Sequence, residues 1–419
     1  MPGSQSADQS PSGWITTSQA AQRLGVKRAT LYSYVSRGVL RSERRPGQQE
    51  SLFDRAQVEA LASAAPRPGA AQPLLRFRSV ATAVSGLRDG ELFLRDTALA
   101  DLAAQGDLEA AVRLVLGLGS APAESAPPHR VADAVLPVLR LLPLPRRLPA
   151  AVQVLGGTDP LAYDLAPESA ARSAHRVVTQ AVGLVGQARR RAAKGRLNQP
   201  DRPGRPDRHE PLEHTVGRIL TGHALSSAEN DCLATLLIVL LDHGLTASTI
   251  AARVAASTRA PVHDCLLAAY ATMAGPLHGA ASLATYDLLA ALRAGGRDEE
   301  PSDALARAMA GHPTLPGFGH VLYSGADPRV AMVLDRLWEL PGTTPLRADV
   351  EALVSLVAER TGAQPNVDLA VAAVAHALDL PAEAGMVLYQ VARSFGVAAH
   401  VIEEYAERPL RWRGHQQEW

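Results

Sequence analysis

The sequence predicts an all-α protein that carries a small, separate unit at its N-terminus. The chain has 419 residues, which is longer than one typical domain. Apolar residues make up 47% and aromatic residues only 4%, so Leu, Ala and Val must build the core, a mixture that favours packed helices. Helical segments rich in Ala continue to the C-terminus, and outside the N-terminal unit a strand pattern is found only at 91–94.

The charge balance and the cysteines exclude several classes of protein. Lys plus Arg and Asp plus Glu are each 42, so no overall charge draws the molecule to nucleic acid or to a membrane surface. Cys232 and Cys265 lie in apolar helical stretches without metal-ligand spacing, and we expect buried thiols and no metal site. The polar N-terminus and the lack of a long apolar span predict a cytoplasmic protein without a membrane segment.

Turn and cap signals place two short helices near the N-terminus. Helix starts at Thr17 and Lys27 and helix stops at Gly25 and Gly38 give two helices joined by a turn. A basic, turn-rich segment at 41–49 then leads to an apolar pair, Leu52-Phe53, and Asp54 follows as the N-cap of a further helix.

This order resembles the N-terminal winged helix-turn-helix domain of MerR-type and excisionase-type regulators, and we place it at 14–63. The resemblance implies that the second helix enters the major groove of DNA and that the wing contacts phosphate. The alternative is a solvated basic face on a protein-docking module. The residues expected to contact DNA are Lys27, Arg28, Thr30 and Tyr32 on the second helix and Arg41, Arg44 and Arg45 on the wing.

Composition sets the boundaries of the remaining chain. Residues 64–74 are rich in Pro, Ala and Gly and predict a semi-rigid linker. A second Pro- and Arg-rich segment at 194–211 predicts an exposed loop. Between this loop and the C-terminus, Ser226 and Glu229 form a possible capping box before CLATLLIVLLDHG, which is apolar on every face and therefore predicts a helix at the centre of a large helical domain.

Three histidines stand in segments where a ligand could approach. His243 follows the apolar helix, where a capping or core role is the more common explanation. His278 lies in GPLHG, between a helix end and a glycine that leaves the imidazole uncrowded, although an isolated turn histidine in solvent is equally compatible. His320 lies in PGFGH, a Gly- and Pro-rich connection.

Charged residues near the C-terminus complete the candidate site. Asp368 lies in the first turn of a helix that Asn366 can cap, where favourable interaction with the helix dipole is the ordinary explanation; desolvation there could instead make the carboxylate a general base. Arg329, Arg393 and Arg408 could hold a dianionic substrate, although a surface salt bridge also explains Arg329.

The joint order of these segments resembles the signature of the citrate synthase family. The order is DHG with AST, GPLHG, PGFGH with DPR, PNVD, and then RSFG and ERP, and a fainter similarity begins near SVATAVSGLRDGELFLRD. The resemblance implies a citrate synthase-like region at 75–419, in which a small helical domain at about 266–375 is inserted in a large helical domain. It also implies a homodimer whose small domain closes over the substrates.

The family resemblance assigns each candidate residue a role. Asp368 would remove a methyl proton from the acyl thioester, His278 would stabilise the enol or enolate oxygen, and His320 would donate to the oxaloacetate carbonyl. Oxaloacetate would be bound by His243, Arg329, Arg393 and, from the other subunit, Arg408. The loop formed by Leu315, Pro316, Gly317, Phe318 and Gly319 would border CoA, which is a substrate, so no cofactor or metal is implied.

Some positions depart from the family pattern. The usual Glu and Asn after the DH pair are Gly244 and Thr246, and the Asn-Glu pair after GPLHG is Ser282-Leu283. We expect a citrate synthase that condenses acetyl-CoA with oxaloacetate. The alternatives are a 2-methylcitrate synthase that uses propionyl-CoA, and a DNA-binding regulator whose citrate synthase-like part senses metabolites.

Overall fold

The structure is a computed structural model, and its chain divides into two compact units, Met1–Ala81 and Thr82–Trp419. Each unit is described by itself. The described residues are 13–24, 31, 35, 40–44, 51–58, 80–88, 90–120, 122, 129–194 (side chains to 189), 210–294, 315–320, 322–323 and 325–412.

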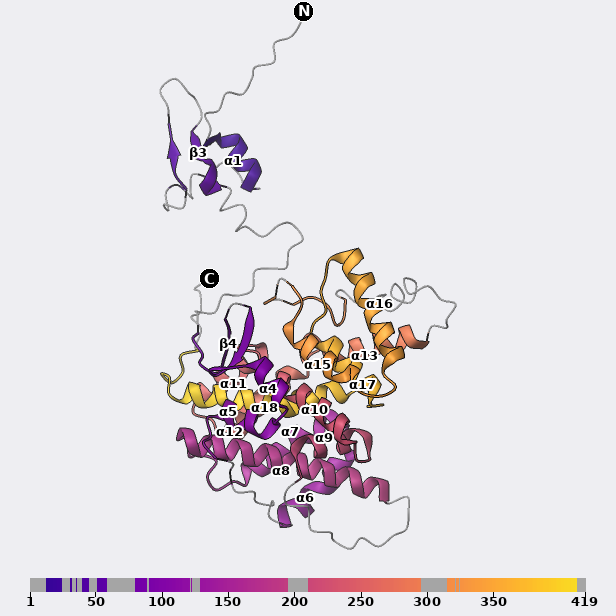
Figure 1. The fold of residues 1–419 in the computed structure, drawn as a ribbon. Helices are drawn as coiled ribbons and strands as arrows, with labels where there is room; N and C mark the ends of the chain where they lie inside the picture. The colour runs from indigo at the N-terminus through magenta and orange to yellow at the C-terminus, as the bar shows by residue number, and fades with distance from the viewer. Residues whose placement is uncertain are drawn as a thin grey trace, which may run out of the picture. The chain divides into compact units, whose positions relative to one another are not determined.

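The first unit combines a short helix with a three-stranded antiparallel sheet (Figure 1). Its elements are β1 (Trp14–Thr16), α1 (Thr17–Leu24), β2 (Ser42–Glu43) and β3 (Leu52–Asp54), and β3 lies between β1 and β2. The predicted helix start at Thr17 is confirmed. The predicted N-cap is also confirmed, because Asp54 Oδ1 accepts hydrogen bonds from the backbone N–H groups of Ala56 (2.9 Å) and Gln57 (3.3 Å).

Strand β1 was not predicted, since a three-residue strand is too short to show an alternating pattern. Ile15 on β1 and Phe53 on β3 are nevertheless buried, and they pack with Leu31 and Val58 in a small core. The sheet and α1, which contributes Ala20, therefore share one core.

The second unit begins with a small antiparallel sheet, of which only the middle strand was predicted. It is formed by β4 (Ser85–Arg88), β5 (Glu91–Leu94) and β6 (Thr97–Ala98), in that order. Strands β4 and β6 have four and two residues, and they carry too few apolar positions to be recognised from sequence.

The rest of the second unit is helical, which confirms the all-α prediction. Its helices are α4 (Leu99–Gln105), α5 (Leu108–Leu116), α6 (His129–Leu141), α7 (Leu144–Gly157), α8 (Pro167–Lys194), α9 (Leu212–Thr221), α10 (Ser227–Leu240), α11 (Ala247–Ser257), α12 (Val262–Met273), α13 (Ala281–Ala294), α15 (Pro328–Trp338), α16 (Thr344–Thr361), α17 (Val367–Ala377) and α18 (Ala384–Tyr405).

Helices α10 and α18 occupy the centre of this unit. The predicted capping box of α10 is confirmed, with Ser226 and Glu229 bonded reciprocally, and every residue from Cys232 to Leu240 is buried. Helix α18 crosses the unit and packs on α8, α10, α11 and α12 (Figure 1). It approaches the chain after α10 so closely that a Cβ at Gly396 would lie 2.1 Å from the Leu241 carbonyl oxygen, which only glycine permits.

Helices α13, α15, α16 and α17 pack on one another to one side of α18 (Figure 1). This group falls largely within 266–375, where the sequence predicts a small inserted domain. Both α15 and α17 also contact the central helices, α15 through α10 and α17 through α18. The site residues on α15 and α17 are thereby brought to the residues that α10 and α18 carry. Among the described residues, no helix is long and apolar enough to cross a membrane.

Candidate active site

Asp368 lies at the N-terminus of α17, where the predicted cap is present. The Asn366 side chain accepts a hydrogen bond from the Asp368 backbone N–H at 2.9 Å, and Asp368 lies in the first turn of the helix. Its Oδ1 atom is buried and has no hydrogen-bond partner within the described residues. Burial raises the pKa of Asp368 to about 6, although the Arg329 charge and the Tyr389 hydroxyl oppose the rise. The carboxylate is therefore a base whose pKa lies close to neutral pH.

The glycine-rich loop 315–320 is fixed against the start of α17. The Asn366 backbone N–H donates to the Gly317 carbonyl (2.9 Å), and the Asn366 side chain donates to the Gly319 carbonyl (2.9 Å). Gly317 has φ +82°, and a Cβ there would lie 2.6 Å from Thr285 Cγ2. One asparagine therefore holds both Asp368 and the backbone that leads to His320.

Arg329 is buried, which corrects its possible explanation as a surface salt bridge. Its Nε and Nη2 donate to the two oxygens of Asp327 at 3.0 and 2.7 Å, and Arg329 and Asp327 are 2% and 1% exposed. Asp327 also accepts from the Val367 backbone N–H at 3.1 Å, so this ion pair joins α15 to α17. A guanidinium has five N–H donors, and Asp327 uses two of them, which leaves donors for an anionic ligand.

His243, His320 and Tyr323 form a cluster of three rings. The ring centroids of His243 and His320 lie 4.9 Å apart, and Tyr323 lies 5.5 Å from His243 and 4.7 Å from His320. His243 Nε2 is 2.8 Å from the Tyr323 hydroxyl. Burial, with the nearby charges of Arg329 and Arg393, lowers the pKa of His243 to about 2, so this imidazole is neutral.

His320 is also held neutral, and its proton position is defined. Burial first and the Arg329 charge second lower its pKa. The Leu322 backbone N–H donates to His320 Nδ1 at 3.1 Å, so Nδ1 carries a lone pair and the neutral ring has its proton on Nε2. An N–H donor at Nε2 suits donation to a carbonyl oxygen.

His278 contacts Ser248 in the first turn of α11. Its Nε2 lies 2.8 Å from Ser248 Oγ, and Thr246 Oγ1 lies 3.1 Å from the same Ser248 oxygen. Burial and the Arg393 charge lower the pKa of His278 to about 4. Thr246, one of the departures from the family pattern, therefore supports His278 through Ser248.

Arg393 lies on α18 and connects to the end of α10. It is 3% exposed, and its Nε donates to the Leu240 carbonyl at 2.9 Å. The guanidinium carbon lies 5.9 Å from the centroid of the Tyr389 ring, one helical turn earlier. The charges of Arg393 and Arg329 both lower the pKa of His243, so the two guanidinium groups act on the same imidazole.

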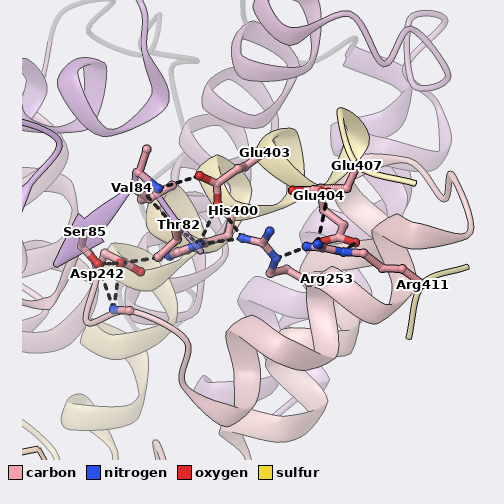
Figure 2. A network of polar contacts seen from close by, with 12 residues as sticks. Thr82, Val84, Ser85, Asp242, Arg253, His400, Glu403, Glu404, Glu407 and Arg411 are labelled. Carbon is pink, nitrogen blue, oxygen red and sulfur yellow. Dashed lines mark hydrogen bonds and ion pairs between the residues drawn. The ribbon is translucent and has the colours of Figure 1, made fainter. Parts of the chain in front are cut away.

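A buried polar network fixes the segment that carries His243 (Figure 2). Asp242 accepts hydrogen bonds from Ser85 on β4 and from the Gly244 backbone N–H, and it pairs with His400 Nε2 at 3.1 Å. Burial is the largest influence on the Asp242 pKa and would raise it, but the ion pair with His400, the Arg393 charge and the Ser85 hydrogen bond together outweigh burial, so the net pKa is lowered. Gly244, another departure, has φ +69° and donates to Ser85 Oγ at 3.0 Å.

Not every predicted residue joins this site. Arg408 is exposed in the turn after α18, and within the described ranges no hydrogen bond or ion pair connects it to the other candidates. On the first unit, Arg41 and Arg44 are exposed, whereas Lys27, Arg28, Thr30, Tyr32 and Arg45 lie outside the described residues. Loop 315–319 lies within the described residues, and the contact of this loop with CoA stays a prediction.

Sequence reasoning missed four residues that contact the predicted ones. Tyr323 and Tyr389 adjoin His243 and Asp368, and Asp242 and His400 brace the segment beside His243. Tyr389 was detectable, because it precedes Arg393 by four residues on one helix and must lie on the same face. Throughout the described ranges, no group of three or more His, Cys, Asp or Glu residues could hold a metal ion.

Comparisons with known proteins give two family matches along the chain. Residues 74–413 match the model of the citrate synthase C-terminal domain, and residues 14–65 match that of a helix-turn-helix domain. Citrate synthase 2 of Bacillus subtilis is 28% identical over 63% of this chain and 69% of its own length. 2-Methylcitrate synthase 2 of Corynebacterium glutamicum is 30% identical over 42% of this chain and 45% of its own length.

Solved structures share the fold. The citrate synthase of Pyrobaculum aerophilum has a TM-score of 0.66 at 21% identity, with 82% of this chain and 92% of that chain covered. The citrate synthase of Thermotoga maritima has a TM-score of 0.63 at 23% identity, with 81% and 93% covered. At these identities the likeness concerns the fold.

Proposed function

The chain belongs to the citrate synthase family, and from this premise we propose that it condenses acetyl-CoA with oxaloacetate and water to give citrate and CoA. The observation that carries the proposal is the Asp368 carboxylate, which has a pKa of about 6 and whose Oδ1 atom is buried without a hydrogen-bond partner among the described residues. A methyl group beside a thioester is a very weak acid, so its deprotonation needs a positioned base and stabilisation of the oxygen that gains charge.

The neighbouring histidines supply the other half of the reaction. Asp368 removes a methyl proton, and His278 donates a hydrogen bond to the thioester oxygen. Nε2 of His278 lies 2.8 Å from Ser248 Oγ. In the tautomer in which the Ser248 hydroxyl donates to Nε2, the proton of the neutral ring lies on Nδ1, and Nδ1–H serves this role. The enol carbon attacks the oxaloacetate carbonyl carbon while His320 Nε2–H protonates its oxygen. Water then cleaves the thioester, which releases CoA.

The cations account for a dicarboxylate substrate. Arg329 and Arg393, whose charges both act on His243, can each grip one carboxylate, and Arg408 is supplied by the other subunit of a homodimer. Loop 315–319 borders CoA. The reaction requires no metal or prosthetic group.

The test is release of free CoA thiol by the purified protein with oxaloacetate and either acetyl-CoA or propionyl-CoA. Asp368→Asn should lose turnover, whereas Asp101→Asn, which alters an exposed aspartate that also lies in the first turn of its helix, α4, should retain it. Preference for propionyl-CoA would identify a 2-methylcitrate synthase, as in the Corynebacterium relative. Wild-type protein that binds oxaloacetate but turns over neither thioester would overturn the proposal.

A second function is proposed for the first unit. The match to a helix-turn-helix domain and the exposed Arg41 and Arg44 favour DNA binding. In a regulator of this kind, oxaloacetate or CoA esters would change DNA affinity. Mobility-shift titrations at fixed salt, with and without oxaloacetate, test this, and DNA affinity that ignores the ligand would remove the metabolite-sensing part.

A further inference from the structure

We propose that Glu404 is a positioning residue that holds the C-terminal segment 406–412 so that Arg408 is presented to the active site of a second copy of the chain. The inference rests on the proposed function, in which Arg408 completes the oxaloacetate site of the partner. Its evidence is the pattern of contacts around Glu404.

Glu404 lies near the end of α18 and is 0% exposed. One oxygen accepts from Arg253 Nε (2.8 Å) and Arg411 Nη2 (2.6 Å), and the other accepts from Arg411 Nε (2.7 Å) and Trp412 Nε1 (2.9 Å). Arg253 belongs to α11 and Arg411 to the segment itself (Figure 2), as does Trp412. A single buried carboxylate therefore joins the segment to the body of the unit with charge-assisted bonds.

The backbone of the segment is fixed as well. Arg259 donates to the carbonyls of Glu404 (3.3 Å) and Glu407 (2.7 Å), and the Leu410 N–H donates to the Ser257 carbonyl (2.9 Å). Leu410 adopts φ +58°, an unfavourable conformation for a leucine that these contacts must maintain. The turn containing Arg408 thus has a defined shape.

Arg408 is treated differently from its neighbours. Arg411 is hydrogen-bonded to Glu404 and also pairs with Glu407 at 3.2 Å. Arg408, in contrast, is exposed and has no hydrogen bond or ion pair in the part of the chain that the structure describes. The segment therefore places one cation outward on a pre-ordered turn. Pre-ordering lowers the entropy lost when this arginine binds a carboxylate, so loosening the turn should weaken oxaloacetate binding in the partner's site.

The test uses Arg411→Gln, which removes two bonds to Glu404 from a partly exposed side chain, with Glu404→Gln as a second variant. Arg172→Gln is the control, since Arg172 makes a similar two-nitrogen contact with Glu168 on α8, between side chains that are both exposed. We expect Arg411→Gln to raise KM for oxaloacetate roughly tenfold with a smaller change in kcat, and Arg172→Gln to change neither.

Mixed dimers, with a different affinity tag on each subunit, show which site the change affects. A dimer of Asp368→Asn and Arg411→Gln subunits has one site with an intact Asp368 and an intact partner segment. It should show wild-type KM and half the wild-type kcat. A KM that stays raised would place the effect in the variant's own subunit and overturn the proposal, as would an unchanged KM in the Arg411→Gln homodimer.

A second mixed dimer, of Asp368→Asn and Arg408→Gln subunits, distinguishes failure of the shared site from failure of the proposed role of Glu404. If its KM stays raised, or if the protein is a monomer, the shared site itself is wrong. If its KM is restored while that of the Arg411→Gln mixture is not, only the role of Glu404 fails.

Discussion

The Tyr323 hydroxyl lies 2.8 Å from Nε2 of His243, so a loop tyrosine partners the imidazole proposed to bind oxaloacetate. The imidazole is neutral and 5% exposed, so it depends on this contact for orientation. Tyr323→Phe should raise KM for oxaloacetate about fivefold, as expected for the loss of one hydrogen bond, with little change in kcat. Tyr163→Phe, which alters a tyrosine that is 79% exposed, is the control for the steady-state assay. An unchanged KM would refute an orienting role.

The pH dependence of the reaction follows from Asp368. A general base acts only when deprotonated, and burial raises the pKa of this carboxyl to about 6. The value of kcat/KM should therefore rise with pH, with a midpoint near pH 6, and level off above it. Initial rates from pH 5 to pH 8 measure this, and a rate that is flat down to pH 5 would exclude Asp368 as the base with this pKa.

The same shift predicts a stability difference. The folded pKa of Asp368 is raised from 3.8 to about 6, so the charged form destabilises the fold above pH 6 and this penalty disappears below about pH 4. Asp368→Asn should therefore be more stable than wild type at pH 8, by at most about 3 kcal/mol, and equal to it near pH 4. Urea unfolding at both pH values is the measurement. Equal stability at pH 8 would mean that the carboxylate is solvated.

The elements that were predicted from the sequence are those whose signals are local. The Ser226–Glu229 capping box, the buried α10 and the Asp54 cap each depend on residues within a few positions of one another. Strands β4 and β6 were not predicted, because strands this short are defined by pairing with a neighbour and not by their own sequence pattern.

In the candidate site, too, residues in local motifs were predicted and contacts between distant segments were not. His278, His320 and Asp368 were found because each stands in a distinctive motif. The network beside His243 was not predicted. Asp242 and His400 are 158 positions apart, Ser85 comes from strand β4, and no sequence pattern relates the three. Contacts that depend on the packing of distant helices need coordinates.

That network predicts a large effect on folding. Asp242 and His400 are each 0% exposed, so Asp242→Asn would leave the buried His400 with only the more distant Glu403 carboxylate, at 3.8 Å, as an opposing charge. The free energy of unfolding should fall by roughly 3 kcal/mol or more. Denaturant unfolding measures it, with Asp96→Asn, which alters an exposed ion pair with Arg88, as the control. A loss below about 1 kcal/mol, the level expected of surface pairs, would show that this charge is not needed.

The proposed DNA contact of the first unit makes a prediction about salt. Arg44 is exposed on the wing, where a guanidinium can neutralise one phosphate and release a condensed counterion. Arg44→Gln should weaken binding to every DNA sequence by a similar factor and reduce the slope of log K against log salt by about 0.9. Fluorescence anisotropy across a salt series measures both, with Arg140→Gln, which alters an exposed arginine of α6, as the control. A slope that stays the same, with affinity lost at one sequence only, would mean that Arg44 reads a base and not the backbone.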